Sequence, residues 1–335
     1  MTGVLLIQLG TPDSPSVSDV RKYLSEFLND PRVIDIPYLL RKFLVNVIIV
    51  PFRAPKSAKL YKKLWTDKGS PLLFYSVSLK EKLQSALGSN FEVELAMRYQ
   101  NPPMESVLER MKEKGYEKII ILPLFPQYAS ASSGSAIEKA LKIIKQWWVI
   151  PELKIISQFY NDEDYINSVV EQGQKYNLAD YDHILFSYHG LPVRQVDKVY
   201  NDGKPCSDHN CEIEINPSNQ YCYKAACFAT TRLLAEKLNI PKEKYTVCFQ
   251  SRLDKKWLEP FSDKVIIEHA KKGTKKLLVF SPAFVADCLE TIVEIGHDYS
   301  ILFKENGGSQ LQLVESLNDT PHWVIALKNM ILSQS

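Results

Sequence analysis

Short runs of apolar and β-branched residues recur along the chain, and they constrain its fold more than any other feature of the sequence. The runs lie at residues 4–8, 92–97, 118–124, 153–157, 183–187, 246–250, 276–280 and 311–314. Fully apolar runs such as residues 119–122 are typical of strands buried on both faces. Helical patterns separate the runs, for example at residues 17–28, 77–87, 104–114, 135–147, 222–238, 286–303 and 322–332. The alternation predicts an α/β fold with parallel sheets and helices on both faces.

The length of the chain predicts two domains. A single domain of 335 residues would exceed the usual limit of roughly 250–300 residues. One long helical pattern ends near residues 148–151, and a new strand begins directly after it. We therefore expect an N-terminal domain over residues 1–150 and a C-terminal domain from residue 151.

Charge and missing motifs exclude several classes of ligand. Lys and Arg number 41 and Asp and Glu number 39, so the net charge is +2. Nucleic-acid-binding domains usually carry a large basic excess, so we expect no nucleic-acid partner. The sequence contains neither G-x-G-x-x-G nor G-x-x-x-x-G-K-[ST]. We therefore expect no nucleotide cofactor.

The N-terminal residues carry no basic region or cleavage site of a secretory signal, which favours a cytoplasmic location. Residues 43–52 form the longest apolar stretch, but this stretch is too short for a membrane-spanning helix. Its apolar residues, with Leu39 and Leu40, could share one face beside Arg41 and Lys42. Two interpretations remain open, an ordinary core helix and a peripheral contact at the inner membrane.

The segments that follow the predicted strands are the places to look for function, because ligands of open α/β sheets bind past the carboxyl ends of the strands. Residues 9–15, 126–135, 188–192 and 281–284 have unusual compositions there. His189 ends one strand and is followed by Gly190 and Pro192. A neutral imidazole in that position can accept a proton or bind a divalent metal near pH 7.

Three carboxylates follow the strand at residues 276–280. Asp287, Glu290 and Glu294 are spaced i, i+3 and i+7, so one helix over residues 284–295 would present them on a single face. Like charges stacked in this way repel one another. A relay for protons or a path for a divalent cation would account for them, whereas a solvated acidic face is the alternative.

Four of the six cysteines lie in one polar segment within residues 200–228, namely Cys206, Cys211, Cys222 and Cys227. In a cytoplasmic protein, this clustering indicates metal or cluster ligation rather than disulfides. The spacing lacks the C-x2-C pairs common in zinc sites. We therefore favour a [2Fe–2S] cluster and keep zinc, or no metal, as alternatives. Cys248 and Cys288 are expected in the core.

Aromatic and cationic residues are expected at the same strand ends. Arg98 and Tyr99 end one strand, Tyr128 follows the next, and Phe284 and Trp257 belong to the second half of the chain. These side chains would suit a flat, apolar ligand that bears carboxylates.

The sequence resembles the ferrochelatase family over nearly its whole length. The matching segments are residues 8–15 (QLGTPDSP), 21–31 (RKYLSEFLNDP), 58–65 (AKLYKKLW), 69–72 (GSPL), 122–134 (LPLFPQYASASSG), 187–192 (SYHGLP), 249–252 (FQSR) and 281–295 (SPAFVADCLETIVEI). The resemblance implies two similar Rossmann-like domains, each with a four-stranded parallel sheet, and a porphyrin in the cleft between them. It also implies that residues 310–335 return to the first domain, so that the second covers residues 151–309.

By this resemblance, the invariant histidine of the family falls on His189 and its essential glutamate on Glu290, with Asp287 and Glu294 completing the acidic row. The other matched positions are the porphyrin-contacting residues Arg98, Tyr128 and Phe284, and we add Tyr99, Trp257 and Leu9 to the expected substrate-binding set. His189 and Glu290 are also the expected ligands of the Fe²⁺ substrate.

The implied activity is that of a lyase that inserts Fe²⁺ into protoporphyrin IX, the last step of haem synthesis. The coproporphyrin-using branch carries a tyrosine where Asp13 stands here, which favours protoporphyrin IX. Handover of the porphyrin from protoporphyrinogen oxidase at a membrane is a further expectation. The alternatives are an iron–sulfur redox or sensor protein and a chelatase for another tetrapyrrole or metal, such as coproporphyrin III or cobalt.

Overall fold

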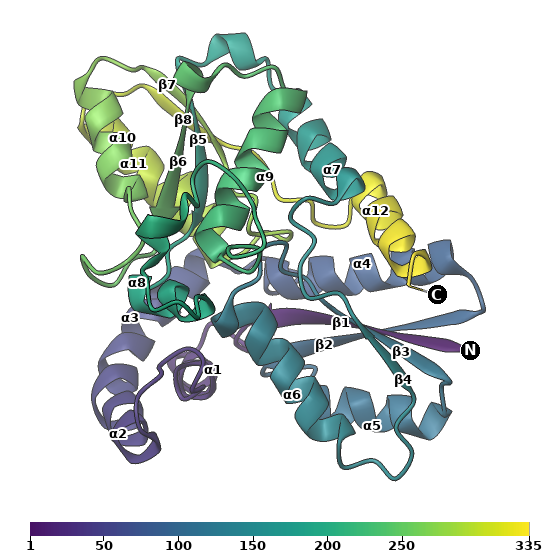
Figure 1. Cartoon of the computed structure of the whole chain (residues 1–335). Helices are drawn as coiled ribbons and strands as arrows, with labels where there is room; N and C mark the ends of the chain where they lie inside the picture. Colours follow the sequence, from purple (N-terminus) through teal and green to yellow (C-terminus); the bar gives the residue numbers. More distant parts are fainter. Residues whose placement is uncertain (335) are drawn as a thin grey trace. The chain divides into compact units, whose positions relative to one another are not determined.

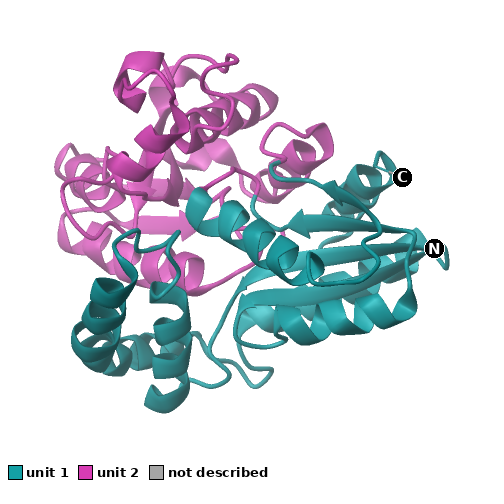
Figure 2. Cartoon of the chain, turned by 60° about the horizontal axis from the view of Figure 1, so that its bottom comes forward, with its two compact units in different colours: residues 1–125, 130–158, 318–335 teal, residues 126–129, 159–317 magenta. Residues whose placement is uncertain are grey.

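The structure is a computed structural model that describes residues 1–334, and the chain within it divides into two compact units. Unit 1 comprises Met1–Phe125, Ser130–Gln158 and the C-terminal segment from Asn318, and unit 2 comprises Pro126–Ala129 and Phe159–Leu317 (Figure 2). Each unit contains one four-stranded parallel sheet. The prediction of an α/β fold with two such sheets is confirmed.

Unit 1 contains the first strand of the chain and its last helix. Its elements are β1 (Thr2–Gly10), α1 (Val17–Leu28), α2 (Tyr38–Phe43), η1 (Leu44–Ile49), α3 (Val50–Leu64), α4 (Pro71–Leu87), β2 (Phe91–Tyr99), α5 (Met104–Lys114), β3 (Lys118–Pro123), η2 (Ser130–Gly134), α6 (Ser135–Ile144), β4 (Glu152–Ile155) and α12 (Pro321–Leu332).

The first sheet has the order β2-β1-β3-β4, with helices on both faces (Figure 1). On one face, Leu5, Ile7 and Ile121 pack with Val107 of α5 and Ala140 of α6. Helix α4 covers β1 and β2, and α12 packs on α4. The continuous apolar run in β1 is therefore buried on both sides, as its composition predicts.

Unit 2 repeats this arrangement. Its elements are α7 (Glu163–Gln174), η3 (Leu178–Asp180), β5 (His183–His189), α8 (Val193–Val196), η4 (Asp197–Val199), η5 (Cys206–His209), α9 (Tyr223–Lys237), η6 (Lys242–Lys244), β6 (Tyr245–Gln250), α10 (Ser262–Lys271), β7 (Lys276–Phe280), η7 (Leu289–Tyr299), α11 (Ser300–Glu305) and β8 (Gln310–Leu313).

The second sheet has the order β6-β5-β7-β8, so both sheets place their strands in the same sequence of second, first, third and fourth. Leu185, Val279 and Phe303 belong to the core on the side of α10 and α11. Helices α7 and α9 lie on the other side of this sheet (Figure 1). All eight apolar runs of the sequence are strands.

The bounds of the units differ from the expected domain bounds at three points, and one of them is that Pro126–Ala129 belong to unit 2. Strand β4 pairs with β3, so unit 1 runs past the join expected at residue 150 to Gln158. Strand β8 pairs with β7, so the returning segment begins at Asn318 rather than at residue 310. The apolar run predicts the strand itself. Which strand it pairs with depends on contacts made by the rest of the chain.

The apolar stretch near residue 43 is helical but is not an ordinary core helix. Seven apolar side chains of α2, η1 and α3 are exposed, and we call them the α2–α3 patch: Tyr38, Leu39, Leu40, Phe43, Val47, Ile48 and Phe52. Arg41, expected beside this face, is buried and donates a hydrogen bond to the Ile36 carbonyl at 2.7 Å. No helix among residues 1–334 is long and apolar enough to cross a membrane.

Candidate active site

Three neighbouring strands of unit 2 end at one edge of its sheet, at His189, Gln250 and Phe280. These strands are parallel, with Phe186 of β5 paired both with Val247 of β6 and with Phe280 of β7. The segments that follow them therefore gather at this edge, where open α/β sheets bind ligands.

His189 is half-buried, and its ring is oriented by the backbone. Its Nδ1 lies 2.6 Å from the carbonyl oxygen of Gly190, which can only accept a hydrogen bond. Nδ1 therefore carries the proton, and in the neutral ring Nε2 keeps its lone pair. The Tyr223 hydroxyl donates to the His189 carbonyl at 2.9 Å. The rings of Trp257 and Phe284 flank the imidazole, with centroids 6.4 and 6.3 Å away.

Gly190 allows the loop after β5 to pass close to β6. Its N–H donates to the Gln250 carbonyl at 2.8 Å. A Cβ at this position would lie 2.8 Å from the same oxygen and 3.3 Å from Trp257 Cε3. Only glycine fits there without displacing the segment that carries His189.

The acidic segment differs from its prediction. The helix begins at Leu289, and residue Cys288 before it is extended, with φ −149° and ψ −171°. Asp287 therefore precedes the helix, and the three carboxylates do not form one helical row. The helix itself is π-helical over Leu289–Tyr299, a rare conformation that is frequent at functional sites. The predicted row requires the period of an α-helix from residue 284, and the chain does not have that conformation here.

Glu294 is held by donors from two directions. It accepts hydrogen bonds from the Ser251 N–H at 2.9 Å, the Ser251 hydroxyl at 2.5 Å, Gln250 Nε2 at 3.3 Å and the Tyr299 hydroxyl at 2.9 Å. Burial, followed by the charge of Glu294, raises the pKa of Tyr299, so its phenol remains a donor. These four bonds fill the acceptor positions of a carboxylate and tie η7 to the end of β6.

Asp287 is buried at the start of the same helix. It accepts from the Thr291 hydroxyl and from the Ser316 N–H, each at 3.3 Å. Thr291 Oγ1 in turn accepts from the Cys288 N–H at 3.0 Å. Asp287 and Thr291 thus stabilise the first turn of η7.

Glu290 is half-buried one turn before Glu294, and the backbone carbonyl of Glu290 accepts from Gln250 Nε2 at 3.0 Å. Its carboxylate contacts the buried thiol of Cys288. Burial, and then the charge of Glu290, raises the pKa of that thiol, so Cys288 stays protonated beside the carboxylate. Of the three acids, Glu290 is the one whose carboxylate accepts no backbone hydrogen bond in the contacts described above.

In unit 1, the expected substrate-binding residues Arg98 and Tyr99 belong to a buried ionic network. Arg98 Nη2 lies 2.5 Å from Asp30 Oδ2, and the Tyr99 hydroxyl donates to the same oxygen at 2.8 Å. Burial alone would raise the pKa of Asp30, but hydrogen bonds from Ser135 and the Arg32 backbone, with the charge of Arg98, lower it overall. Tyr99 is fully buried, so it supports Arg98 rather than presenting its ring. Leu9 is half-buried near the end of β1.

Tyr128 belongs to unit 2 although it follows β3 of the first sheet. Gln127 beside it donates to Thr230 of α9 at 3.0 Å, which anchors this short segment. The ring of Tyr128 meets Tyr221 edge-on, with centroids 5.8 Å apart. The predicted aromatic residues Tyr128, Phe284 and Trp257 thus all lie in the unit that carries His189.

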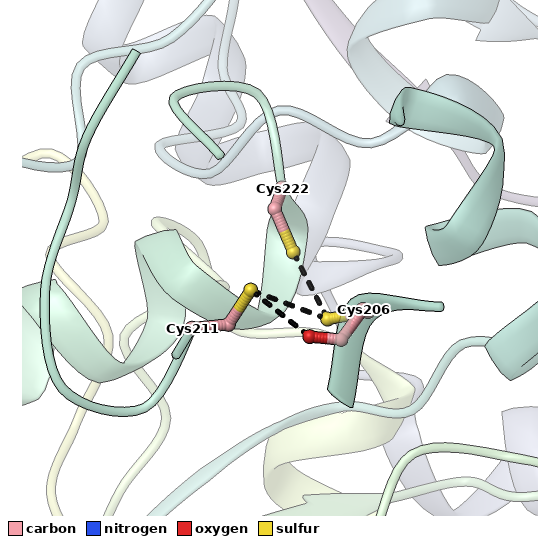
Figure 3. Close-up of side chains that lie close together, drawn as sticks. All are labelled: Cys206, Cys211 and Cys222. Atoms are coloured by element: carbon pink, nitrogen blue, oxygen red, sulfur yellow. Dashed lines mark hydrogen bonds between the residues drawn. The ribbon is translucent and has the colours of Figure 1, made fainter. Parts of the chain in front are cut away.

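Three of the four clustered cysteines converge. Cys206 Sγ lies 3.4 Å from the sulfur atoms of both Cys211 and Cys222, and all three sulfurs lie within 4.8 Å of one another (Figure 3). All three residues are buried. Hydrogen bonds from Cys206 and Cys211 lower the pKa of the Cys222 thiol, which favours a thiolate there.

Cys227 is not part of this trio. Cys222 caps the N-terminus of α9, whereas Cys227 lies inside the helix and contacts the Tyr223 side chain. The thiol of Cys227 is buried, which raises its pKa. Cys227 follows Cys222 by five positions, so the two side chains leave α9 on different faces.

Two four-stranded α/β units of equal strand order, with a histidine and an acidic helix at one strand edge, define a protein of the chelatase fold. Solved structures agree. The structure of SirB from Bacillus subtilis with Fe³⁺ has a TM-score of 0.54 and 12% identity, covering 99% of this chain and 94% of that one. CbiX, described as the terminal enzyme for biosynthesis of siroheme in denitrifying bacteria, has a TM-score of 0.50 and 13% identity over 99% of both chains.

The chain belongs to the ferrochelatase family, whose sequence profile matches residues 1–335. A ferrochelatase of Coxiella burnetii (strain Dugway 5J108-111) is 46% identical over 331 residues, 98% of this chain and 92% of its own length. A ferrochelatase of Legionella pneumophila (strain Lens) is 44% identical over 333 residues, 99% of both chains. The family consists of lyases that act as metal chelatases in haem biosynthesis, and the predictions of family, fold and enzyme class are confirmed.

The residues that hold Glu294 were missed as functional residues. Ser251 belongs to the FQSR segment, but its sequence gives no sign that its backbone would have φ +59° and point both donors at Glu294. The helical pattern at residues 286–303 does not distinguish Tyr299 from its neighbours. A polar residue directly after a parallel strand was the one signal that could have identified Ser251.

Proposed function

We propose that this chain inserts Fe²⁺ into protoporphyrin IX to form protohaem, with His189 as the acceptor of the pyrrole protons. The observation that carries this proposal is the orientation of His189. Its Nδ1 donates to Gly190 at 2.6 Å, so the lone pair on Nε2 is available as a base. Metal insertion releases two pyrrole protons, and a neutral imidazole positioned beside the ring is suited to accept them.

Glu290 is proposed to meet the metal and the porphyrin nitrogen atoms from the opposite face. Its carboxylate is not committed to backbone donors, unlike that of Glu294, which accepts from Ser251 and Tyr299. Glu294 and Asp287 are proposed to form the path for protons or metal behind it. Carboxylate oxygens are hard ligands that suit divalent iron in transit.

The porphyrin is proposed to lie against aromatic side chains. Trp257 and Phe284 flank His189 in unit 2, and Tyr128 belongs to the same unit. Binding energy from the ring periphery could hold the macrocycle bent and expose its nitrogen lone pairs. In unit 1, Leu9 and Arg98 are proposed to contact the ligand, with Tyr99 holding Arg98 in place.

Asp13 supports protoporphyrin IX over coproporphyrin III. The side chain is exposed and accepts a hydrogen bond from Asn101 Nδ2 at 2.8 Å. A carboxylate there repels an additional carboxylate of a more acidic porphyrin. Assays of the two porphyrins with Fe²⁺ test this choice, and faster turnover of coproporphyrin III would overturn it.

The assignment of the base is tested with two variants. We expect His189→Ala to lower kcat by about 10²–10⁴-fold, the range for loss of a positioned acid or base. Glu290→Gln should lower kcat as well, while Glu290→Asp should retain part of the activity. The loss of free-porphyrin absorption under anaerobic conditions measures the rate. Near-normal insertion by His189→Ala, with Glu290→Gln inactive, would reassign the base to Glu290.

We further propose that Cys206, Cys211, Cys222 and Cys227 hold a [2Fe–2S] cluster. Three buried sulfur atoms converge within 4.8 Å, and a group of buried thiols is the donor set that such clusters use. Cys227 would have to supply the fourth sulfur ligand from within α9. If Cys227 does not bind, zinc held by the other three cysteines is the alternative. When bound, a [2Fe–2S] cluster supplies a one-electron redox centre.

The visible spectrum of anaerobically purified protein tests the cluster. Broad bands between about 300 and 600 nm are expected from thiolate-bound iron. The single variants Cys206→Ser and Cys227→Ser should each lose these bands. Cys248→Ser should keep them, because Cys248 is buried in β6. A colourless protein with stoichiometric zinc would replace the cluster by zinc. A coloured protein that does not metallate porphyrin would favour the redox-sensor alternative.

The α2–α3 patch supports a peripheral membrane contact, at which protoporphyrinogen oxidase could hand over the porphyrin. Leu39 and Phe52 are 80% and 73% exposed, and Lys42, Arg53 and Lys56 are exposed on the same elements. Apolar side chains beside cations are typical of helices that lie in a membrane interface. We expect flotation with anionic vesicles to be lost in Phe43→Ser/Phe52→Ser but kept in Ile213→Ser, whose side chain is exposed elsewhere. Absence of flotation in the unaltered protein would remove this proposal.

A further inference from the structure

The cysteine-bearing insertion contains a tyrosine that touches the cysteine trio. The Tyr200 hydroxyl lies 2.8 Å from Cys211 Sγ, and the residue is buried. Against a thiolate, this hydroxyl can only donate the hydrogen bond.

The ring of Tyr200 is held in place from its other side by His209. The two rings are stacked, with centroids 3.7 Å apart and planes 18° from parallel. His209 is itself fixed at both nitrogen atoms, because Nδ1 lies 2.9 Å from the Pro205 carbonyl and Nε2 lies 3.0 Å from Asp202 Oδ2. Its side chain is only 7% exposed. Such double fixation of a surface-loop histidine indicates a positioning role.

The segment that carries this pair also carries the cysteines. Asp202 and Pro205 precede Cys206, and the Cys206 N–H donates to Asp197 Oδ1 at 2.8 Å. The residues that hold the stacked rings of Tyr200 and His209 are therefore close in sequence to the cysteines, and Tyr200 contacts Cys211 directly. Side chains that hydrogen-bond metal ligands orient them and tune the metal group.

We propose that Tyr200, positioned by His209, donates a hydrogen bond to the thiolate of Cys211 and tunes the metal group held by the cysteines. This inference rests on the cysteine site proposed above. A hydrogen bond to a ligating sulfur withdraws electron density from it and stabilises the reduced, more negative state of an iron–sulfur centre. The bond also restrains the sulfur in the orientation that a metal requires.

The test compares full-length protein with Tyr200→Phe, purified anaerobically. We expect the reduction potential of the variant to be more negative, its EPR spectrum in the reduced state to change, and its metal to be lost to a chelator about 10–100-fold more readily. His209→Ala should shift the same readouts in the same direction by a smaller amount, and it keeps the proposal testable if Tyr200→Phe fails to fold.

Tyr221→Phe is the matched control, because Tyr221 belongs to the same insertion and its ring contacts Tyr128 rather than a cysteine. We expect it to behave like the unaltered protein. Unchanged potential, EPR spectrum and chelator sensitivity in both Tyr200→Phe and His209→Ala would overturn the inference while leaving the cluster in place. If the unaltered protein holds zinc, the cluster proposal fails, and the chelator measurement alone decides the role of Tyr200. A chain that retains no metal overturns both.

Discussion

The carboxylates of the acidic segment differ at the level of single residues. Glu294 accepts four hydrogen bonds, from Ser251, Gln250 and Tyr299, whereas Asp287 caps the start of η7 through Thr291. Three acids that look equivalent in the sequence therefore have different hydrogen-bond partners. The donors around each carboxylate, rather than its spacing, determine how many of its acceptor positions are filled.

Removing the phenol of Tyr299 should weaken the connection between η7 and β6. Tyr299→Phe deletes one donor to a carboxylate, and hydrogen bonds to charged groups contribute about 1.5–3 kcal/mol. We expect the free energy of unfolding, from urea titration, to fall by that amount. Tyr38→Phe, at a ring that is 61% exposed, is the control and should be neutral. Equal midpoints for both variants would show that the bond contributes nothing.

A second residue-scale prediction concerns two histidines that lie together in unit 2. His183 and His269 are stacked with ring centroids 4.1 Å apart. Burial, and then the charges of His269 and Lys244, lower the pKa of His183 to about 4 from its ordinary 6.5. Between pH 6.5 and 4, the unfolded state binds the extra proton, so stability is present above this window and is lost as pH falls through it.

We measure the loss of unfolding free energy between pH 7 and pH 5. This loss should be larger in the unaltered protein than in His183→Gln by on the order of 1 kcal/mol, a value that allows for solvent screening of a half-buried ring. His322→Gln, on an exposed helix start, should retain the full pH dependence. The prediction would be wrong if His183→Gln kept the same difference between the two pH values.

At the scale of elements, close approach of helix and sheet depends on small residues. Gly173 lies near the end of α7, and a Cβ there would come within 2.7 Å of Phe280 Cζ and 2.8 Å of Phe280 Cε1. The Phe280 ring cannot move freely, because it stacks on Phe186 in the core with centroids 5.1 Å apart. The strand that leads to the acidic segment is thus packed directly under α7.

Gly173→Ala should therefore destabilise unit 2 by about 1–3 kcal/mol through overpacking. Gly296→Ala is the matched control in another helix of the same unit, because its Cβ would meet atoms only at 3.5 and 3.6 Å. There the gain in helix propensity should leave stability unchanged or raise it by up to about 1 kcal/mol. Thermal melts of both variants measure the effect, and a neutral Gly173→Ala would contradict the packing argument.

At the scale of the whole molecule, both ends of the chain belong to unit 1, β1 at the N-terminus and α12 at the C-terminus. Helix α12 packs on α4, and Asp319 before it accepts from the Ser78 hydroxyl at 2.5 Å and pairs with Lys82. Trp323 of α12 is completely buried. The last helix therefore belongs to the core of the unit that contains β1.

Truncating this anchor should unfold unit 1 selectively. We expect Trp323→Ala to cost about 3–5 kcal/mol, the range for a fully buried aromatic side chain. Ile325→Ala, on the same helix but 51% exposed, should cost far less. Urea titration monitored by hydrogen exchange measures stability separately in each strand. The loss of amide protection should be largest in β1, β2, β3 and β4. Equal losses in both units would show that the chain unfolds as one cooperative body.

The eight strands, most helices and the family could be predicted because they depend on local patterns. Short runs of apolar and β-branched residues between helical patterns predict buried strands, and the family profile matches along the whole chain. The sequence alone thus determined the α/β class, two parallel sheets and the segments in which chemistry is expected.

Tertiary structure decided the rest, because it depends on which surfaces meet. It paired β4 and β8 with their sheets, placed Asp287 before the helix and moved Cys227 away from the cysteine trio. It also buried Tyr99 against Asp30 and left the α2–α3 patch exposed. Spacing along the chain fixes distances only within one regular element, whereas donors from different elements and the local helix type set the geometry of a site.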